Sequence, residues 1–201
     1  VDGKNVLRAY SVVSPPWSEE LEFLSIKIPN GALTSQLQHI KVGDEVVIMP
    51  KSTGTLVNSA LLPGGELWML ATGTGLAPFM SLIRDLETLE TWSKIHIVHS
   101  VRDASDLAYN TDLVTAFKDH PQDGELHDMV SAVLKYHPIL TGQGEHRITT
   151  QLAMSELPVN VAVDKIMVCG NLEFNHQVVD WCKAQGMQEG SIRQPGTFVV
   201  E

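Results

Sequence analysis

The sequence is poor in cysteine and in basic residues, and it lacks a long hydrophobic run. Cys169 and Cys182 are its two cysteines, and their spacing matches neither a zinc nor an iron–sulfur motif. Such scarcity is typical of a reducing compartment, so a cytoplasmic location is expected. A formal net charge of -10 disfavours non-specific binding to nucleic acid or to an anionic membrane. No apolar run reaches the length of a membrane span, which excludes a membrane-spanning class.

The first third of the chain has the pattern of short β-strands. Alternating apolar, aromatic and β-branched residues predict strands at three places: 8–14, 21–28 and 44–49. One or two helical turns are expected from Thr34. Short strands between Pro, Gly and Asn turns indicate an antiparallel barrel or sandwich. The "LLPGGE" stretch, residues 61–66, marks the end of this part, so the first domain is expected to span residues 1–63.

From residue 64 to residue 201 the pattern changes to alternating strands and helices. The expected strands are 67–71, 94–101, 131–140, 164–171 and 196–200. The expected helices are 77–89, 112–120, 148–157 and 175–185. Gly186 follows the last helix in the position of a C-terminal stop. This alternation predicts a doubly wound parallel sheet.

The stretch "ATGTGLAP" joins the first apolar strand of the second domain to its first helix. Gly73 and Gly75 let backbone N–H groups approach a ligand closely, and the helix that follows presents further free N–H groups. Pro78 stands where the usual dinucleotide fingerprint has its third glycine. The loop therefore suits a diphosphate or a polarised ring, and the alternative is that its glycines only make a tight turn.

Two polar motifs lie in the first domain. In "RAYS", Arg8 has the chemistry to clamp a phosphate, Tyr10 to stack on a flat ring and Ser11 to bond a ring nitrogen. The alternative is an ordinary strand edge. In "NGALTS", Thr34 or Ser35 is expected as a helix N-cap that leaves free N–H groups for an anion, or simply as a capped helix.

Two arginines and a cysteine follow strands of the second domain. Arg102 comes just after a strand, and open α/β sheets bind ligands at that end of their strands. With Arg147, it is a candidate partner for a 2′-phosphate, which would favour NADP over NAD; the alternative is a solvated surface arginine. Cys169 ends its strand, either as a buried structural residue or beside the reacting carbon of a cofactor ring. The eight histidines form no metal-ligand pattern.

In order along the chain, "RAYS", "PNGALTS", "ATGTGLAPF", "HSVRDASDL" and "VCGN" resemble the bacterial branch of the ferredoxin/flavodoxin–NADP reductase family. The resemblance implies an FAD-binding antiparallel barrel followed by an NADP-binding α/β domain. It also implies a monomer that moves electrons between NADPH and ferredoxin or flavodoxin, by hydride transfer at the flavin. Two alternatives remain: a reductase component of another electron-transfer chain, including a free-flavin reductase, or a non-catalytic NADP-binding module.

The same resemblance assigns site residues. Those implied to bind FAD are Arg8, Ala9, Tyr10, Ser11, Ser25, Ile26, Lys27, Ala32, Leu33, Thr34 and Thr74. Those implied to bind NADP are Thr72, Gly73, Thr74, Gly75, Pro78, Arg102, Arg147, Cys169 and Gly170. Tyr10, Ser11 and Cys169 are the implied catalytic residues, and no metal ligand is expected.

The sequence departs from the family pattern in three places. The family has further barrel strands before the position of Arg8, and its bacterial members continue beyond "FVVE", so the sequence is interpreted as a fragment. The segment "LTGQGEHR" stands where the family often has a more charged one. That difference bears on how adenosine is bound.

Overall fold

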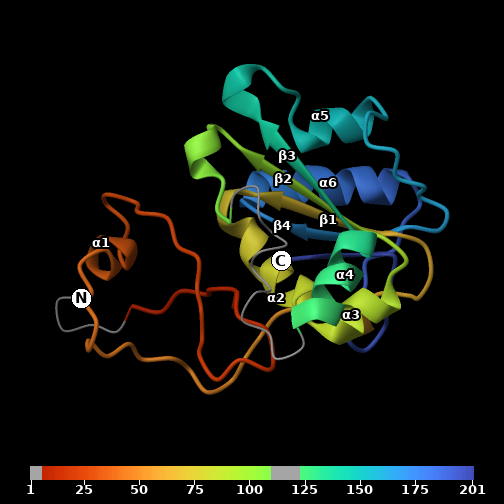
Figure 1. Cartoon of the computed structure of the whole chain (residues 1–201). Coiled ribbons are helices and arrows are strands. Elements are labelled where there is room, and N and C mark those ends of the chain that lie inside the picture. The colour runs from red at the N-terminus through yellow and green to blue at the C-terminus, as the bar shows by residue number, and fades with distance from the viewer. Residues whose placement is uncertain (1–5, 110–122) are drawn as a thin grey trace.

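The structure is a computed structural model of the chain, and it describes residues 6–109 and 123–201. Five parallel strands form one sheet in the order β3-β2-β1-β4-β5 (Figure 1). The strands are β1 (Leu67–Thr72), β2 (Ile95–Val101), β3 (Leu134–Leu140), β4 (Lys165–Cys169) and β5 (Phe198–Val200). The predicted parallel α/β sheet is therefore confirmed. Its strand order reverses between β1 and β4, and open α/β sheets bind ligands beside such a reversal.

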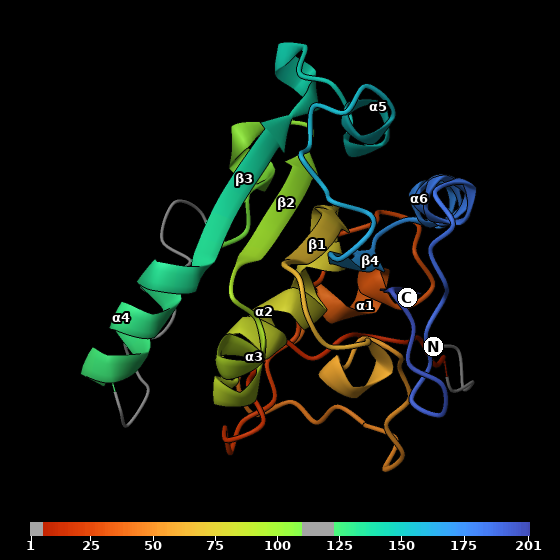
Figure 2. The ribbon, with the colours of Figure 1, turned by 90° about the vertical axis from the view of Figure 1, so that its right-hand side faces the viewer.

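Helices cover both faces of the sheet, because its central strands are apolar on both sides (Figure 2). In β1, Leu67 and Met69 join one buried cluster, whereas Trp68 and Leu70 join the other. The first cluster lies under α2 (Ala77–Ile83), α3 (Leu86–Thr91) and α4 (Asp123–Val133). The second lies under α5 (Ile148–Ala153) and α6 (Leu172–Ala184). These two packed layers hold the carboxyl ends of the strands in place.

The helices agree with the sequence predictions in part. The single helix expected at 77–89 is two helices, because Asp85 is extended (φ -99°, ψ 124°) and its carboxylate caps α3 by accepting from the N–H of Glu87. Helix α4 was not predicted, and the helix expected at 112–120 lies outside the described residues. Gly186 ends α6 with φ +78°, so its predicted stop is confirmed.

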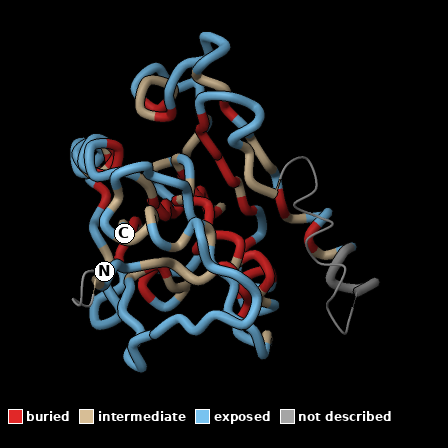
Figure 3. Tube along the Cα trace, turned by 90° about the vertical axis from the view of Figure 1, so that its left-hand side faces the viewer, coloured by how far each residue is buried: buried red, intermediate tan, exposed pale blue. Residues whose placement is uncertain are grey.

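The N-terminal part lies beside α2 and outside the sheet (Figure 1). Within residues 6–63, the strands predicted at 8–14, 21–28 and 44–49 do not form, and no barrel is seen. The pairing within this part is one isolated antiparallel bridge, Val12 with Phe23, and Leu61 forms a second isolated bridge, parallel, with Gly196. The short helix α1 (Thr34–Leu37) is confirmed. An extended segment becomes a strand only when a neighbour pairs its backbone groups, and periodicity alone supplies no neighbour. Most of this part is accordingly exposed (Figure 3).

Candidate functional site

A cavity of about 690 Å³ lies at the carboxyl ends of the strands. The segments after four neighbouring strands line it, with Gly73 after β1, Arg102 after β2, Arg147 after β3 and Asn171 after β4. Ile26, from the N-terminal part, lines the same cavity. Its volume lies within the range of small-molecule and cofactor sites. The topology thus gathers into one place motifs that are far apart in the sequence.

The loop after β1 requires glycine at two positions, for different structural reasons. Gly73 adopts φ +52°, and a Cβ added there would meet nothing within 4 Å, so its surroundings are open. At Gly75 a Cβ would lie 2.1 Å from the carbonyl oxygen of Cys169, so this glycine allows the loop to pack directly on β4. Pro78 is buried in the first turn of α2 and does not line the cavity.

His99, which sequence reasoning assigned to no site, supports the glycine loop. Its ring is fully buried, with Nε2 2.9 Å from the carbonyl oxygen of Gly73 and Nδ1 3.1 Å from the hydroxyl of Tyr136. Burial lowers the pKa of His99, so the ring is neutral near pH 7. These partners assign the tautomer in which Nε2–H donates to Gly73 and Nδ1 accepts from Tyr136. The signal available in the sequence was its place near the carboxyl end of a strand.

The structure brings Arg102 and Arg147 to the same cavity. Their loops are joined where the N–H of Gly142 donates to the carbonyl oxygen of Arg102 at 2.8 Å. Among the described residues, neither arginine forms a salt bridge with a carboxylate. Asp106 and Glu173 also line the cavity, so the two arginines are not its only charges. Two exposed guanidinium groups without a fixed carboxylate are suited to a phosphate.

Cys169 and Gly170 lie under the loop and do not line the cavity. A Cβ at Gly170 would be 2.2 Å from Oγ1 of Thr72, so the glycine allows β4 to approach β1 closely. Burial, and secondarily the charge of Glu201, raises the pKa of the Cys169 thiol to about 12. The thiol is therefore neutral at physiological pH. Glu201 near this thiol was missed, because no motif in the sequence singles it out.

Both cysteines are expected to react slowly with iodoacetamide in the folded protein. Burial raises the pKa of Cys169 and of Cys182 to about 12 from an ordinary value of 9.0. The reactive thiolate is then about a thousandfold scarcer at pH 8 than in the unfolded chain, and it increases as the pH rises. Mass spectrometry of timed samples, with and without urea, measures the two rates. Rapid labelling of the folded chain would contradict this description of the thiols.

Several residues implied to bind FAD lie close to one another in the N-terminal part. The hydroxyl of Tyr10 is 3.2 Å from Oγ of Ser25, and its ring meets that of Phe23 edge-on, with centroids 6.4 Å apart. The exposed members of the implied set are Arg8, Ala9, Ser25, Ile26, Lys27 and Ala32, and the partly buried ones are Tyr10, Ser11, Leu33, Thr34 and Thr74. Ile26 and Thr74 line the cavity described above.

The predicted N-cap of the short helix is wrong. Leu33 occupies the cap position without a side-chain hydrogen bond, because α1 begins at Thr34 itself. The hydroxyl of Thr34 instead donates to the carbonyl oxygen of Ile28 at 3.2 Å. This bond closes the turn that precedes the helix.

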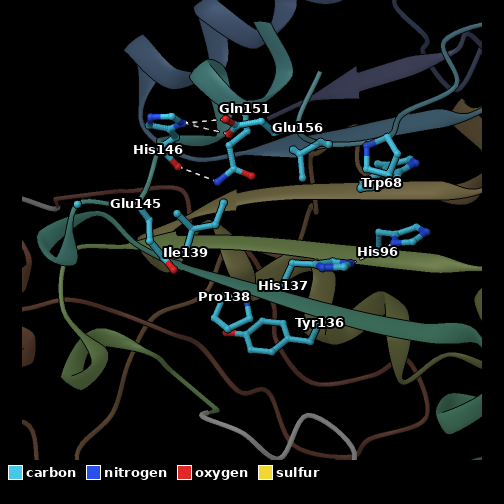
Figure 4. Close-up of a pocket in the computed structure, with 13 residues that line it drawn as sticks. Trp68, His96, Tyr136, His137, Pro138, Ile139, Glu145, His146, Gln151 and Glu156 are labelled. Atoms are coloured by element: carbon cyan, nitrogen blue, oxygen red, sulfur yellow. Dashed lines mark hydrogen bonds and ion pairs between the residues drawn. The ribbon is translucent and has the colours of Figure 1, made fainter. Parts of the chain in front are cut away.

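A second cavity, of about 800 Å³, lies between β3 and α5 (Figure 4). His96 stacks on Trp68 there with ring centroids 4.0 Å apart, and its Nδ1 is 3.1 Å from Nε2 of His137. Neither the glycine loop nor an arginine lines this cavity. The described part of the chain contains no group of three or more His, Cys, Asp or Glu placed to hold a metal ion. The first cavity is therefore the candidate nucleotide site.

Comparison with known proteins agrees with this geometry. A family model described as an oxidoreductase NAD-binding domain matches residues 69–180. The flavodoxin/ferredoxin–NADP reductase of Rhodobacter capsulatus is 47% identical over an alignment covering 100% of this chain and 77% of that protein. The ferredoxin–NADP reductase of Pseudomonas aeruginosa is 40% identical, with coverage of 100% and 81%. A crystal structure of a ferredoxin NADP+ reductase from Neisseria gonorrhoeae, with bound FAD and NADP, has a similar fold: TM-score 0.82, 24% identity, coverage of 96% and 78%.

Proposed function

The chain belongs to the ferredoxin/flavodoxin–NADP reductase family, and from this we propose that it transfers electrons between NADPH and ferredoxin or flavodoxin through FAD. One observation carries the proposal: a single cavity is lined by the glycine loop, by both arginines and by Ile26 of the N-terminal part. A reductase of this kind needs a nucleotide site and a flavin site that meet, and this cavity joins the two parts of the chain.

The second domain, residues 64–201, is proposed to bind NADP. Arg102 and Arg147 hold the 2′-phosphate through charge-assisted hydrogen bonds. Gly73 and Thr74 border the nicotinamide, because the open surroundings of Gly73 allow a flat ring to approach the backbone. Buried, neutral His99 fixes the carbonyl group of Gly73 and so the shape of this loop. Cys169, also neutral, packs beneath the loop through its backbone carbonyl group at Gly75.

The first domain, residues 1–63, is proposed to contribute the residues that bind FAD. When bound, FAD supplies hydride exchange with NADPH and the release of single electrons. Tyr10 stacks on the ring system, Ser11 donates a hydrogen bond to a ring nitrogen, and Ser25 orients the Tyr10 hydroxyl. Arg8 is exposed and has no carboxylate partner within the described residues, which supports a phosphate-binding role.

We also propose that the protein acts as a monomer in the cytoplasm. The low cysteine content and the buried, neutral state of both thiols support a reducing compartment. Among the described helices, none has both the length and the apolar character that crossing a bilayer requires. Ferredoxin and flavodoxin are the partners given in the relatives' names, and they are proposed here as the electron carriers.

Replacing Ser11 by alanine is expected to slow flavin reduction by NADPH about tenfold, since one hydrogen bond to the ring nitrogen is lost. NADP affinity should change little, because Arg102 and Arg147 line the cavity and Ser11 does not. Stopped-flow absorbance measures the first quantity and an equilibrium titration the second. Ser52→Ala, at an exposed position outside the cavity, is the control. An unchanged reduction rate would remove Ser11 from the mechanism.

Anaerobic electron transfer tests the proposed function. FAD-loaded protein is mixed with NADPH and with ferredoxin, flavodoxin or free FMN, and the reduction of each acceptor is followed by its absorbance. Reduction of ferredoxin or flavodoxin with NADPH, and not with NADH, is expected. Reduction of free FMN alone would favour a free-flavin reductase instead. Binding of NADP without reduction of any acceptor would favour a non-catalytic module.

A further inference from the structure

Three charged or polar side chains from separate segments meet beside the candidate site. Glu22 directly precedes Phe23 in the turn between Val12 and Phe23, Arg84 caps the C-terminus of α2, and Tyr109 lies in the segment after β2. Nη1 of Arg84 is 3.2 Å from Oε2 of Glu22, and the Tyr109 hydroxyl donates to Oε1 of the same carboxylate. The guanidinium carbon of Arg84 lies 5.6 Å from the centroid of the Tyr109 ring. Each of the three side chains therefore contacts the other two.

The arginine at the centre of this group is buried. Arg84 is 8% exposed, and a buried arginine is uncommon unless it is paired. Its Nε has no hydrogen-bond partner within the described residues. The ion pair between Nη1 and the Glu22 carboxylate is therefore the main interaction that offsets the burial of the arginine charge. Removing the carboxylate charge leaves a buried cation without its counterion. The cluster is thus sensitive to single changes that keep the shape of the side chain.

The same end of α2 holds the other arm of the N-terminal turn. The indole N–H of Trp17 donates to the backbone carbonyl oxygen of Arg84 at 3.0 Å. The hydroxyl of Ser81 donates to the carbonyl oxygen of Ser14 at 2.8 Å. The turn between Val12 and Phe23 is therefore fixed to α2 on both sides.

Tyr109 has an unusual backbone conformation. Its φ is +60°, in the left-handed region that a bulky residue adopts only when its surroundings hold it there. The hydrogen bond to Glu22 and the contact between the ring and the Arg84 guanidinium group hold the Tyr109 side chain in place. The side chain of Tyr109 thus joins the segment after β2 to the N-terminal part.

The segments joined by the cluster also form part of the cavity wall. Leu24 and Ile26 follow Glu22 in the sequence and line the cavity. Leu107 and Ala108 directly precede Tyr109 and line it as well. The contact between Glu22 and Tyr109 therefore ties a wall segment of the N-terminal part to a wall segment of the α/β domain.

We propose that Glu22, Arg84 and Tyr109 form a clamp that sets the spacing between these two wall segments, and so positions the flavin-side segment against the nicotinamide end of NADP. The three are positioning residues, because none of them lines the cavity itself. This inference rests on the proposed function. Arg102 and Arg147 lie outside the clamp. Loss of the clamp should therefore change how the nicotinamide ring is placed against the flavin ring, and should not change the binding of the 2′-phosphate.

Two variants test the clamp in the full chain. Tyr109→Phe removes the hydroxyl and keeps the ring beside Arg84, and Glu22→Gln removes the charge and keeps the shape. Glu189→Gln is the matched control, because Glu189 forms an exposed pair with Lys183 at 3.3 Å and does not line the cavity. Hydrogen exchange of peptides from residues 13–26 and 102–109 is the first measurement, and it needs no cofactor. We expect about fivefold faster exchange in both segments, in both variants, and no change in the control.

The second measurement separates positioning from general damage. In the FAD-loaded variants, flavin reduction by NADPH should fall about tenfold, while affinity for 2′-phospho-AMP stays within about twofold. Unchanged hydrogen exchange in the two segments would overturn the clamp. An equal loss of 2′-phospho-AMP affinity would overturn its positioning role. If NADPH does not reduce the flavin of the unmodified protein, the proposed function fails, and hydrogen exchange alone decides whether the clamp joins the segments.

Discussion

Replacing Arg102 and Arg147 together by alanine is expected to weaken NADPH binding about a hundredfold and to leave NADH binding nearly unchanged. Each guanidinium group that bonds a phosphate contributes about tenfold or more in affinity, and the two line one cavity from neighbouring loops. NADH lacks the 2′-phosphate, so it gains nothing from either arginine. Each single variant should lose about tenfold, because the remaining arginine still contacts the phosphate.

Equilibrium titration with both nucleotides measures this change in preference. Arg193→Ala is the matched control, because Arg193 is exposed and does not line the cavity. The difference between the two nucleotides should also shrink at high salt in the unmodified protein, since the contacts are between charges. An equal loss of NADH and NADPH affinity in the double variant would mean that the arginines support the loop and do not bind the 2′-phosphate.

Replacing Gly75 by alanine is expected to destabilise the protein by about 1–3 kcal/mol and to impair nucleotide binding. The added Cβ would lie 2.1 Å from the carbonyl oxygen of Cys169 and 2.6 Å from its carbonyl carbon. Both are backbone atoms of a central strand, so the clash is relieved only by moving the loop away from β4. That movement also shifts Gly73 and Thr74, which line the cavity.

Gly73→Ala is the comparison for this substitution. Gly73 has φ +52°, so alanine is strained there, but its Cβ would meet no atom within 4 Å. Its destabilisation should therefore remain near 1 kcal/mol. Urea unfolding gives both free energies of unfolding, and titration with NADP gives the affinities. Equal destabilisation by the two substitutions would show that backbone conformation, and not packing against Cys169, determines the loss in free energy of unfolding.

The α/β sheet was predictable because its signals are local. Buried parallel strands such as β1 and β4 are short continuous apolar runs, and each is followed by a glycine or polar residue where the chain leaves the sheet. The positions of Gly73, Arg102 and Arg147 at one end of the sheet then follow from the topology. The N-terminal strands were not predicted correctly, because pairing depends on residues that are not adjacent in the sequence.

The parts of the site that sequence reasoning missed depend on long-range contacts. His99 bonds Gly73 and Tyr136, which are 26 and 37 residues away. The Tyr109 hydroxyl bonds a carboxylate 87 residues away. No spacing rule connects such residues, so they become visible only when the fold brings them together. The predicted N-cap at Thr34 failed for a local reason, since α1 begins at Thr34 and the hydroxyl bonds Ile28 within the preceding turn.

The visible spectrum of the FAD-loaded protein, recorded anaerobically during addition of nucleotide, tests the central claim most directly. The arrangement of Ile26, the glycine loop and the two arginines around one cavity predicts a bound flavin whose absorbance bleaches with one equivalent of NADPH and persists with NADH. A protein that binds no flavin, or a flavin that NADH bleaches as fast as NADPH does, would contradict it.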